Sequence, residues 1–222
     1  MYKAIIFDMD GLLIDSEKLC LSSFNDSCRD FGFVVDLSVY YSTIGANEER
    51  ARDILSGCMA SDVSFSDFMI RWETKYEEKV SDGELVLKNG VTILLNLLDE
   101  LGIPSAVATS SSYLKAIAKL EKMGILGSFG AVVGGDQVER SKPHPDIYIY
   151  AARALGVDPE KCLALEDSDN GVRSALAAGM RVIQVPDLVG PSKETRKLGH
   201  MICPSLADVV RYVSSCYDRT TD

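Results

Sequence analysis

Short apolar runs recur along the chain, and longer segments with apolar residues at helical spacing lie between them. The runs lack the alternation of a half-exposed strand and therefore predict strands buried on both faces. They cover residues 3–8, 104–109, 130–134, 162–166 and 181–185. The helical patterns cover residues 90–101, 113–123, 145–155 and 172–178. This repeated alternation predicts an α/β fold with a doubly wound, Rossmann-like parallel sheet and helices on both faces.

One long segment breaks the alternation of strand and helix. From about residue 16 to 82 the chain shows only amphipathic helical patterns. We therefore expect an α/β core formed by residues 1–15 and 83–222, with an α-helical cap inserted at residues 16–82. The last residues, 218–222, are expected to be frayed.

Composition and charge exclude several classes of function. The 222 residues are 46% apolar, which is enough for a sizeable core, and carry a formal net charge of −10 without a Lys/Arg cluster. We therefore expect no nucleic-acid partner. No apolar run approaches the length of a membrane span, and no secretory cleavage site precedes the first strand, so we expect a cytoplasmic protein without a membrane partner. We expect a monomer or weak homodimer. Six scattered cysteines without a Cys-x-x-Cys pair predict buried free thiols in a reducing cytoplasm.

Side chains capable of chemistry follow four of the predicted strands. They are Asp8 and Asp10, then Thr109 and Ser110, then Lys142, and finally Glu166 and Asp167. Ligands of an open parallel sheet bind beyond the carboxyl ends of its strands, so these groups should meet at one edge. Clustered carboxylates repel one another unless a cation lies among them, and oxygen ligands favour Mg²⁺. Lys142, Thr109 and the backbone N–H of Ser110 could hold phosphoryl oxygens.

Each of these features also has an ordinary structural explanation. The pair Asp8 and Asp10 could form a turn or a helix cap. Residues 109–111 could cap the following helix, and Lys142 could be a solvated loop residue. His144 is expected to be a loop or helix-start residue. The joint placement at four strand ends favours phosphoryl transfer, in which one carboxylate attacks phosphorus and a second carboxyl moves protons.

The ordered motifs resemble those of the haloacid dehalogenase-like hydrolase superfamily. Residues 7–16, Phe-Asp-Met-Asp-Gly-Leu-Leu-Ile-Asp-Ser, resemble its first motif, and residues 107–110 resemble its second. Lys142-Pro143 resembles the third motif, and residues 165–171 resemble the fourth. The helical insertion is similar to that of the subgroup containing β-phosphoglucomutase and many sugar-phosphate phosphatases.

The resemblance implies roles for the residues at these positions. Asp8 would be the nucleophile and a metal ligand, and Asp10 the general acid/base, with its carbonyl on the metal. Thr109 and Lys142 would bind the phosphoryl group. Asp167 would be a metal ligand, and Glu166 either a ligand or the neighbour of one. Dehalogenases have no acid at the position of Asp10, because a halide leaves without a proton, so Asp10 favours phosphate chemistry.

Departures in the predicted cap bear on the substrate. The cap histidine of β-phosphoglucomutase corresponds to Cys20, and its phosphate-gripping arginine corresponds to Glu48, with Arg50 two residues further on. A carboxylate would repel a phosphate, which weakens the mutase interpretation. Asn47, Glu48 and Arg50 are candidate specificity residues, and Trp72 is expected to be a cap-core aromatic.

We therefore predict a Mg²⁺-dependent phosphatase that hydrolyses a small phosphorylated metabolite, such as a sugar phosphate, through an aspartyl-phosphate. The alternative is a β-phosphoglucomutase-like phosphomutase. A receiver-like or non-catalytic phosphate-binding module is a remote alternative. Receiver domains are shorter, lack the insertion and carry their phospho-accepting aspartate after a later strand.

Overall fold

The computed structural model describes residues 1–44, 48–59 and 63–217, with the backbone alone for residues 48–50. The chain divides into two compact units: Met1–Ile14 with Leu87–Asp222, and Asp15–Val86. The segment that we propose as a cap, residues 16–82, falls within the second unit. The expected fraying of residues 218–222 lies outside the described residues.

The first unit contains a six-stranded parallel sheet in the order β3-β2-β1-β4-β5-β6. The strands are β1 (Ala4–Phe7), β2 (Ser105–Ala108), β3 (Ala131–Val133), β4 (Cys162–Glu166), β5 (Arg181–Gln184) and β6 (Met201–Ile202). The first five lie within the predicted apolar runs. β6 was not predicted, because its two residues, although apolar, are too few to form a recognisable run. β1 is central, and Phe7 pairs with Val107 on one side and with Leu165 on the other.

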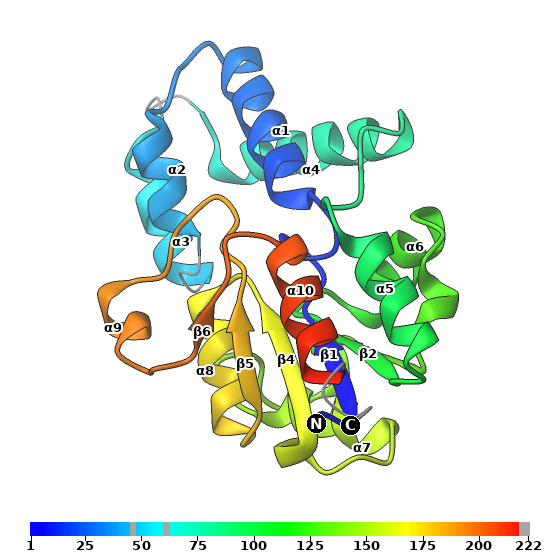
Figure 1. Cartoon of the computed structure of the whole chain (residues 1–222). Helices are drawn as coiled ribbons and strands as arrows, with labels where there is room; N and C mark the ends of the chain where they lie inside the picture. The colour runs from blue at the N-terminus through cyan, green and yellow to red at the C-terminus, as the bar shows by residue number, and fades with distance from the viewer. Residues whose placement is uncertain (45–47, 60–62, 218–222) are drawn as a thin grey trace. The chain divides into compact units, whose positions relative to one another are not determined.

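Helices cover both faces of this sheet, which confirms the predicted α/β class (Figure 1). They are α5 (Val91–Glu100), α6 (Tyr113–Lys122), α7 (Asp146–Ala154), α8 (Asp169–Ala177), α9 (Lys193–Arg196) and α10 (Leu206–Tyr217). α5 packs against α10, and α7 packs against α8 and the strands β1 to β3. Ala4 and Ile6 belong to the core cluster that includes α7 and α8. Ile5 and Phe7 are also fully buried, so β1 is apolar on both faces as predicted.

The second unit is helical. Its elements are α1 (Ser16–Asp30), α2 (Leu37–Thr43), α3 (Glu48–Ser56) and α4 (Phe65–Ser81), and α1 packs along α4. Trp72 lies 5.1 Å from Phe24 between ring centroids, and its indole N–H donates to the carbonyl of Cys20 at 3.0 Å. Trp72 therefore packs within the aromatic interior of this unit, as expected from the sequence.

Two further sequence expectations can be compared with the structure. All six cysteines are free thiols, as predicted, but only Cys28, Cys162 and Cys203 are buried, and Cys58 is exposed. Among the described residues, no helix combines the length and apolarity needed to cross a bilayer.

Candidate active site

A buried cluster of opposite charges lies at the carboxyl ends of β1 and β4. Asp8 follows β1 directly, and its backbone N–H donates to the carbonyl of Leu165 at 2.9 Å. Lys142 Nζ lies 2.6 Å from Asp8 Oδ1 and 2.5 Å from Glu166 Oε1. The Lys142 side chain is only 6% exposed, and that of Glu166 is fully buried. The sheet therefore brings together three residues that are far apart in sequence, as the strand-end argument predicted.

Burial and charge act in opposite directions on this cluster. Burial raises the pKa of the Asp8 carboxyl to about 7. The positive charge of Lys142 lowers this pKa, and the negative charge of Glu166 raises it. Burial alone would lower the pKa of Lys142, but the charges of Asp8 and Glu166 outweigh it and raise that pKa. Lys142 is therefore a fixed cation, and further positive charge near Asp8 would favour its ionised, nucleophilic form.

Glu166 is saturated with hydrogen-bond donors. Its Oε1 accepts from Lys142 and from the Tyr148 hydroxyl at 2.7 Å. Its Oε2 accepts from the backbone N–H groups of Asp167 and Ser168 and from the Ser168 hydroxyl, at 3.1 to 3.2 Å. A carboxylate offers about four lone-pair sites, so these donors leave no spare oxygen for a metal. The contacts favour Glu166 as the anchor of Lys142 rather than as a direct ligand.

One carboxylate oxygen from each of Asp8, Glu166 and Asp167 lies within 4.8 Å of the other two. Gly11 leaves room beside Asp167, since a Cβ at this position (φ +83°) would lie 2.4 Å from Asp167 Oδ2. Gly171 does the same for Glu166. A tight group of oxygen donors fits a hard divalent cation such as Mg²⁺. Asp8 and Asp167 are the side chains that would hold the ion.

Asp10 is held by residues of the segment that follows β2. Ser111 Oγ donates to Asp10 Oδ2 at 2.8 Å, and Lys119 Nζ donates to Asp10 Oδ1 at 2.6 Å. Sequence reasoning did not identify Lys119. The signal was a lysine at an inward-facing position of a helix, between the buried residues Ala116 and Leu120.

The two predicted phosphate-binding residues of the second motif begin the loop after β2. Thr109 is buried, and its N–H donates to the carbonyl of Val133 at 3.0 Å. Its Oγ1 accepts from the Ser111 N–H at 3.1 Å. Ser110 is exposed. Its carbonyl oxygen lies close to Gly135, since a Cβ added at Gly135 would be 2.5 Å from that oxygen. Thr109 therefore lies at the same edge of the sheet as Asp8.

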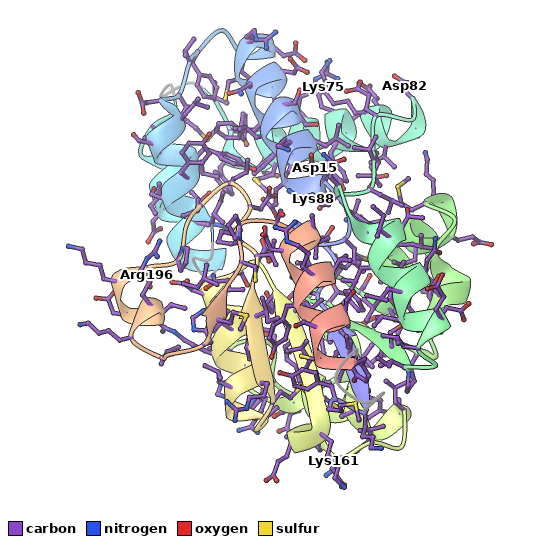
Figure 2. All side chains as sticks on the ribbon, in the orientation of Figure 1. Asp15, Lys75, Asp82, Lys88, Lys161 and Arg196 are labelled. Atoms are coloured by element: carbon purple, nitrogen blue, oxygen red, sulfur yellow. The ribbon has the colours of Figure 1, made fainter. Side chains whose placement is uncertain are left out.

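Two buried polar groups near the carboxyl end of β5 were also missed. Asp187 Oδ1 forms an ion pair with Lys88. Figure 2 shows Lys88 beyond the carboxyl ends of the strands, and Lys161 at the opposite end of the sheet. Asp187 Oδ2 has no hydrogen-bond partner among the described residues. Gln184 Nε2 donates to the carbonyl of Asp167 at 3.0 Å, and Gln184 Oε1 lies 2.8 Å from His200 Nε2. Gln184 therefore holds the backbone of Asp167, a member of the acidic cluster.

Comparison with known proteins places this geometry in a family. The family description that matches residues 5–185 is haloacid dehalogenase-like hydrolase. The chain belongs to this family. The residues that match the family description run from β1 to β5 and therefore include every strand end described above.

Family relatives include enzymes with named phosphatase activities. Phosphorylated carbohydrates phosphatase of Thermotoga maritima is 32% identical over 82% of this chain and 83% of that protein. Hexitol phosphatase B of Escherichia coli is 32% identical over 82% of this chain and 83% of that protein. Among solved structures, CbbY from Rhodobacter sphaeroides in complex with phosphate aligns with a TM-score of 0.74 and 28% identity, covering 94% of this chain and 96% of the other.

The candidate specificity residues of this haloacid dehalogenase-like chain fall at the start of α3. Asn47 lies outside the described residues. Glu48 and Arg50 lie in α3, but their side chains are outside the described part of the structure. Their role in substrate recognition stays a prediction.

Proposed function

We propose that this chain is a Mg²⁺-dependent phosphatase that hydrolyses the monoester of a small phosphorylated metabolite, such as a sugar phosphate. The observation that carries the proposal is the buried Asp8–Lys142–Glu166 cluster with Asp167 beside it. The phosphatase relatives of this family support the same reaction class. The cytoplasmic location and the monomeric or weakly dimeric state stay predictions.

In the first chemical step, a carboxylate oxygen of Asp8 attacks phosphorus as the ester P–O bond breaks, which leaves an aspartyl-phosphate. Lys142 holds phosphoryl oxygens as a fixed cation, and Thr109 can donate its hydroxyl to another. A Mg²⁺ ion held by Asp8 and Asp167 would supply charge neutralisation for the phosphoryl oxygens. Glu166 keeps Lys142 aimed at Asp8 through the hydrogen bonds described above.

Asp10 moves the protons that balance the two steps. As the ester bond breaks, the Asp10 carboxylic acid gives its proton to the leaving oxygen, so an alcohol departs. Water then attacks the aspartyl-phosphate and gives a proton to the Asp10 carboxylate. The bond between phosphorus and the Asp8 oxygen breaks, inorganic phosphate is released, and both aspartates return to their starting states.

The test is a phosphate-release screen over phosphorylated metabolites, with and without Mg²⁺, on the wild type, Asp8→Asn and Asp158→Asn. Asp158 is an exposed control, with a side chain 71% exposed. We expect Asp8→Asn to lose at least about 10³-fold in activity, as removal of a nucleophile does in other hydrolases, and Asp158→Asn to stay active. Full Mg²⁺-dependent activity in Asp8→Asn would refute the proposal, as would a wild type that releases phosphate from no compound.

The phosphomutase alternative is separated by the fate of the phosphoryl group. β-Glucose 1-phosphate is incubated with the enzyme, and free phosphate is measured alongside isomerised sugar phosphate. A phosphatase releases phosphate, whereas a mutase returns the phosphoryl group to a sugar. Isomerised product in excess of free phosphate would replace the phosphatase proposal with the mutase.

A further inference from the structure

Lys119 lies at the edge of the buried side of α6. Ala116, one turn earlier, and Leu120, the next residue, are fully buried, whereas Lys115 and Lys122 are exposed. The Lys119 side chain is itself only 18% exposed, and its ammonium group lies 2.6 Å from Asp10 Oδ1. The aliphatic stem therefore follows the buried side of the helix, and the charged end reaches a carboxylate 109 residues earlier in the chain.

The second oxygen of Asp10 is held from the same segment. Ser111 Oγ donates to Oδ2 at 2.8 Å, so each carboxylate oxygen has its own donor from the β2–α6 region. Asp10 also forms a backbone bridge with Ile14. The backbone bridge fixes the main chain, and the two donors restrict rotation of the side chain.

Stability gives little reason for such an ion pair. Ion pairs that keep some contact with water contribute little to stability, and ordering a long lysine side chain costs rotamer entropy. The placement is explained by what Lys119 does for Asp10.

We propose that Lys119 is a positioning residue for Asp10, the acid/base of the proposed phosphatase reaction, and this inference rests on that proposed function. Lys119 can only donate a hydrogen bond, whereas the Ser111 hydroxyl can donate or accept. Oδ1 therefore stays with Lys119, and Oδ2 is the oxygen that carries the proton to the leaving group. Lys119 exchanges no proton, and the bonds that form and break remain those of the two steps above.

If Lys119 positions Asp10, the loss of Lys119 should affect substrates differently according to their leaving groups. An ester whose leaving group is a strong base needs the proton from Asp10, whereas an acidic phenol can depart as an anion. Loss of Lys119 should therefore slow esters of basic leaving groups far more than esters of acidic ones. A residue that only supports the fold would slow both equally.

The experiment compares Mg²⁺-loaded wild type, Lys119→Met, Lys119→Arg and Lys115→Met on phenyl phosphate and p-nitrophenyl phosphate. Lys115 is an exposed lysine of the same helix and serves as the charge-matched control. We expect Lys119→Met to lower kcat for phenyl phosphate by about 10–100-fold, within the contribution of general acid catalysis. For p-nitrophenyl phosphate the loss should be less than about 3-fold, with KM unchanged for both. Lys119→Arg should recover part of the loss, and Lys115→Met should match the wild type.

The outcomes separate this inference from the proposed function. If the wild type hydrolyses neither ester, the proposed function fails and the inference fails with it. If the wild type is active and Lys119→Met loses nothing, or loses equally on both esters, the positioning role alone is refuted. If Lys119→Met does not fold, as judged by circular dichroism, the neutral Lys119→Gln replaces it with the same expected pattern.

Discussion

Replacing Gly171 by alanine should destabilise this protein, although the same change stabilises most helices. Gly171 lies in the first turn of α8, and glycine costs about 1 kcal/mol relative to alanine within a helix. Here, however, a Cβ would lie 1.8 Å from Glu166 Cδ and Oε1, which is well inside any non-bonded contact. The Glu166 carboxyl must therefore move away from its donors.

The cost follows from the contacts that Glu166 would lose. Inserting a methyl group into a packed interior costs about 1–3 kcal/mol. Breaking a buried hydrogen bond to a charged group costs about 1.5–3 kcal/mol. After the gain in helix propensity, the net loss is about 2–4 kcal/mol, or roughly 5–15 °C in Tm for a chain of this length. Phosphatase activity should fall as well, because Lys142 loses one of its two carboxylate partners.

The measurement is thermal and urea unfolding of Gly171→Ala beside Gly127→Ala. A Cβ at Gly127 would meet no atom within 4 Å, so that control should unfold within about 2 °C of the wild type. A Tm for Gly171→Ala equal to or above that of the wild type would show that Glu166 is not fixed as described.

Two further predictions concern metal binding and the half-buried residue His200. Mg²⁺ at a hundred times its Kd should stabilise the folded protein by about 2.7 kcal/mol. EDTA should reverse this stabilisation, and Asp167→Asn should reduce it. A wild-type Tm that Mg²⁺ leaves unchanged would contradict the metal site. Burial lowers the pKa of His200 below its usual 6.5, so the folded state favours neutral imidazole. At this site the unfolded chain then binds more protons, so the contribution of His200 to stability should fall as the pH drops below 6.5. In urea titrations between about pH 5 and 7.5, His200→Gln should flatten this dependence, and equal slopes would refute it.

Strand-end residues could be predicted from the sequence, because parallel strands deliver their carboxyl ends to one edge whatever the details of packing. Asp8 and Lys142 meet for this reason. Lys119 and Tyr148 could not be assigned in the same way, because the rotation of a helix about its axis decides which polar group each one reaches. The strand β6 could not be predicted, because it is defined by its pairing with β5 and not by a sequence pattern of its own.

The central position of β1 has a consequence for how the protein is made. The strand that leads to Asp8 hydrogen-bonds only to β2 and β4, whose residues are translated much later. At about 5–20 residues per second, roughly 10–30 s of synthesis separate Phe7 from its partner Leu165. During this interval the apolar β1 has an unpaired edge and is exposed to aggregation on the ribosome. A nascent chain therefore acquires the buried cluster of Asp8, Lys142 and Glu166 only after β4 has emerged from the ribosome.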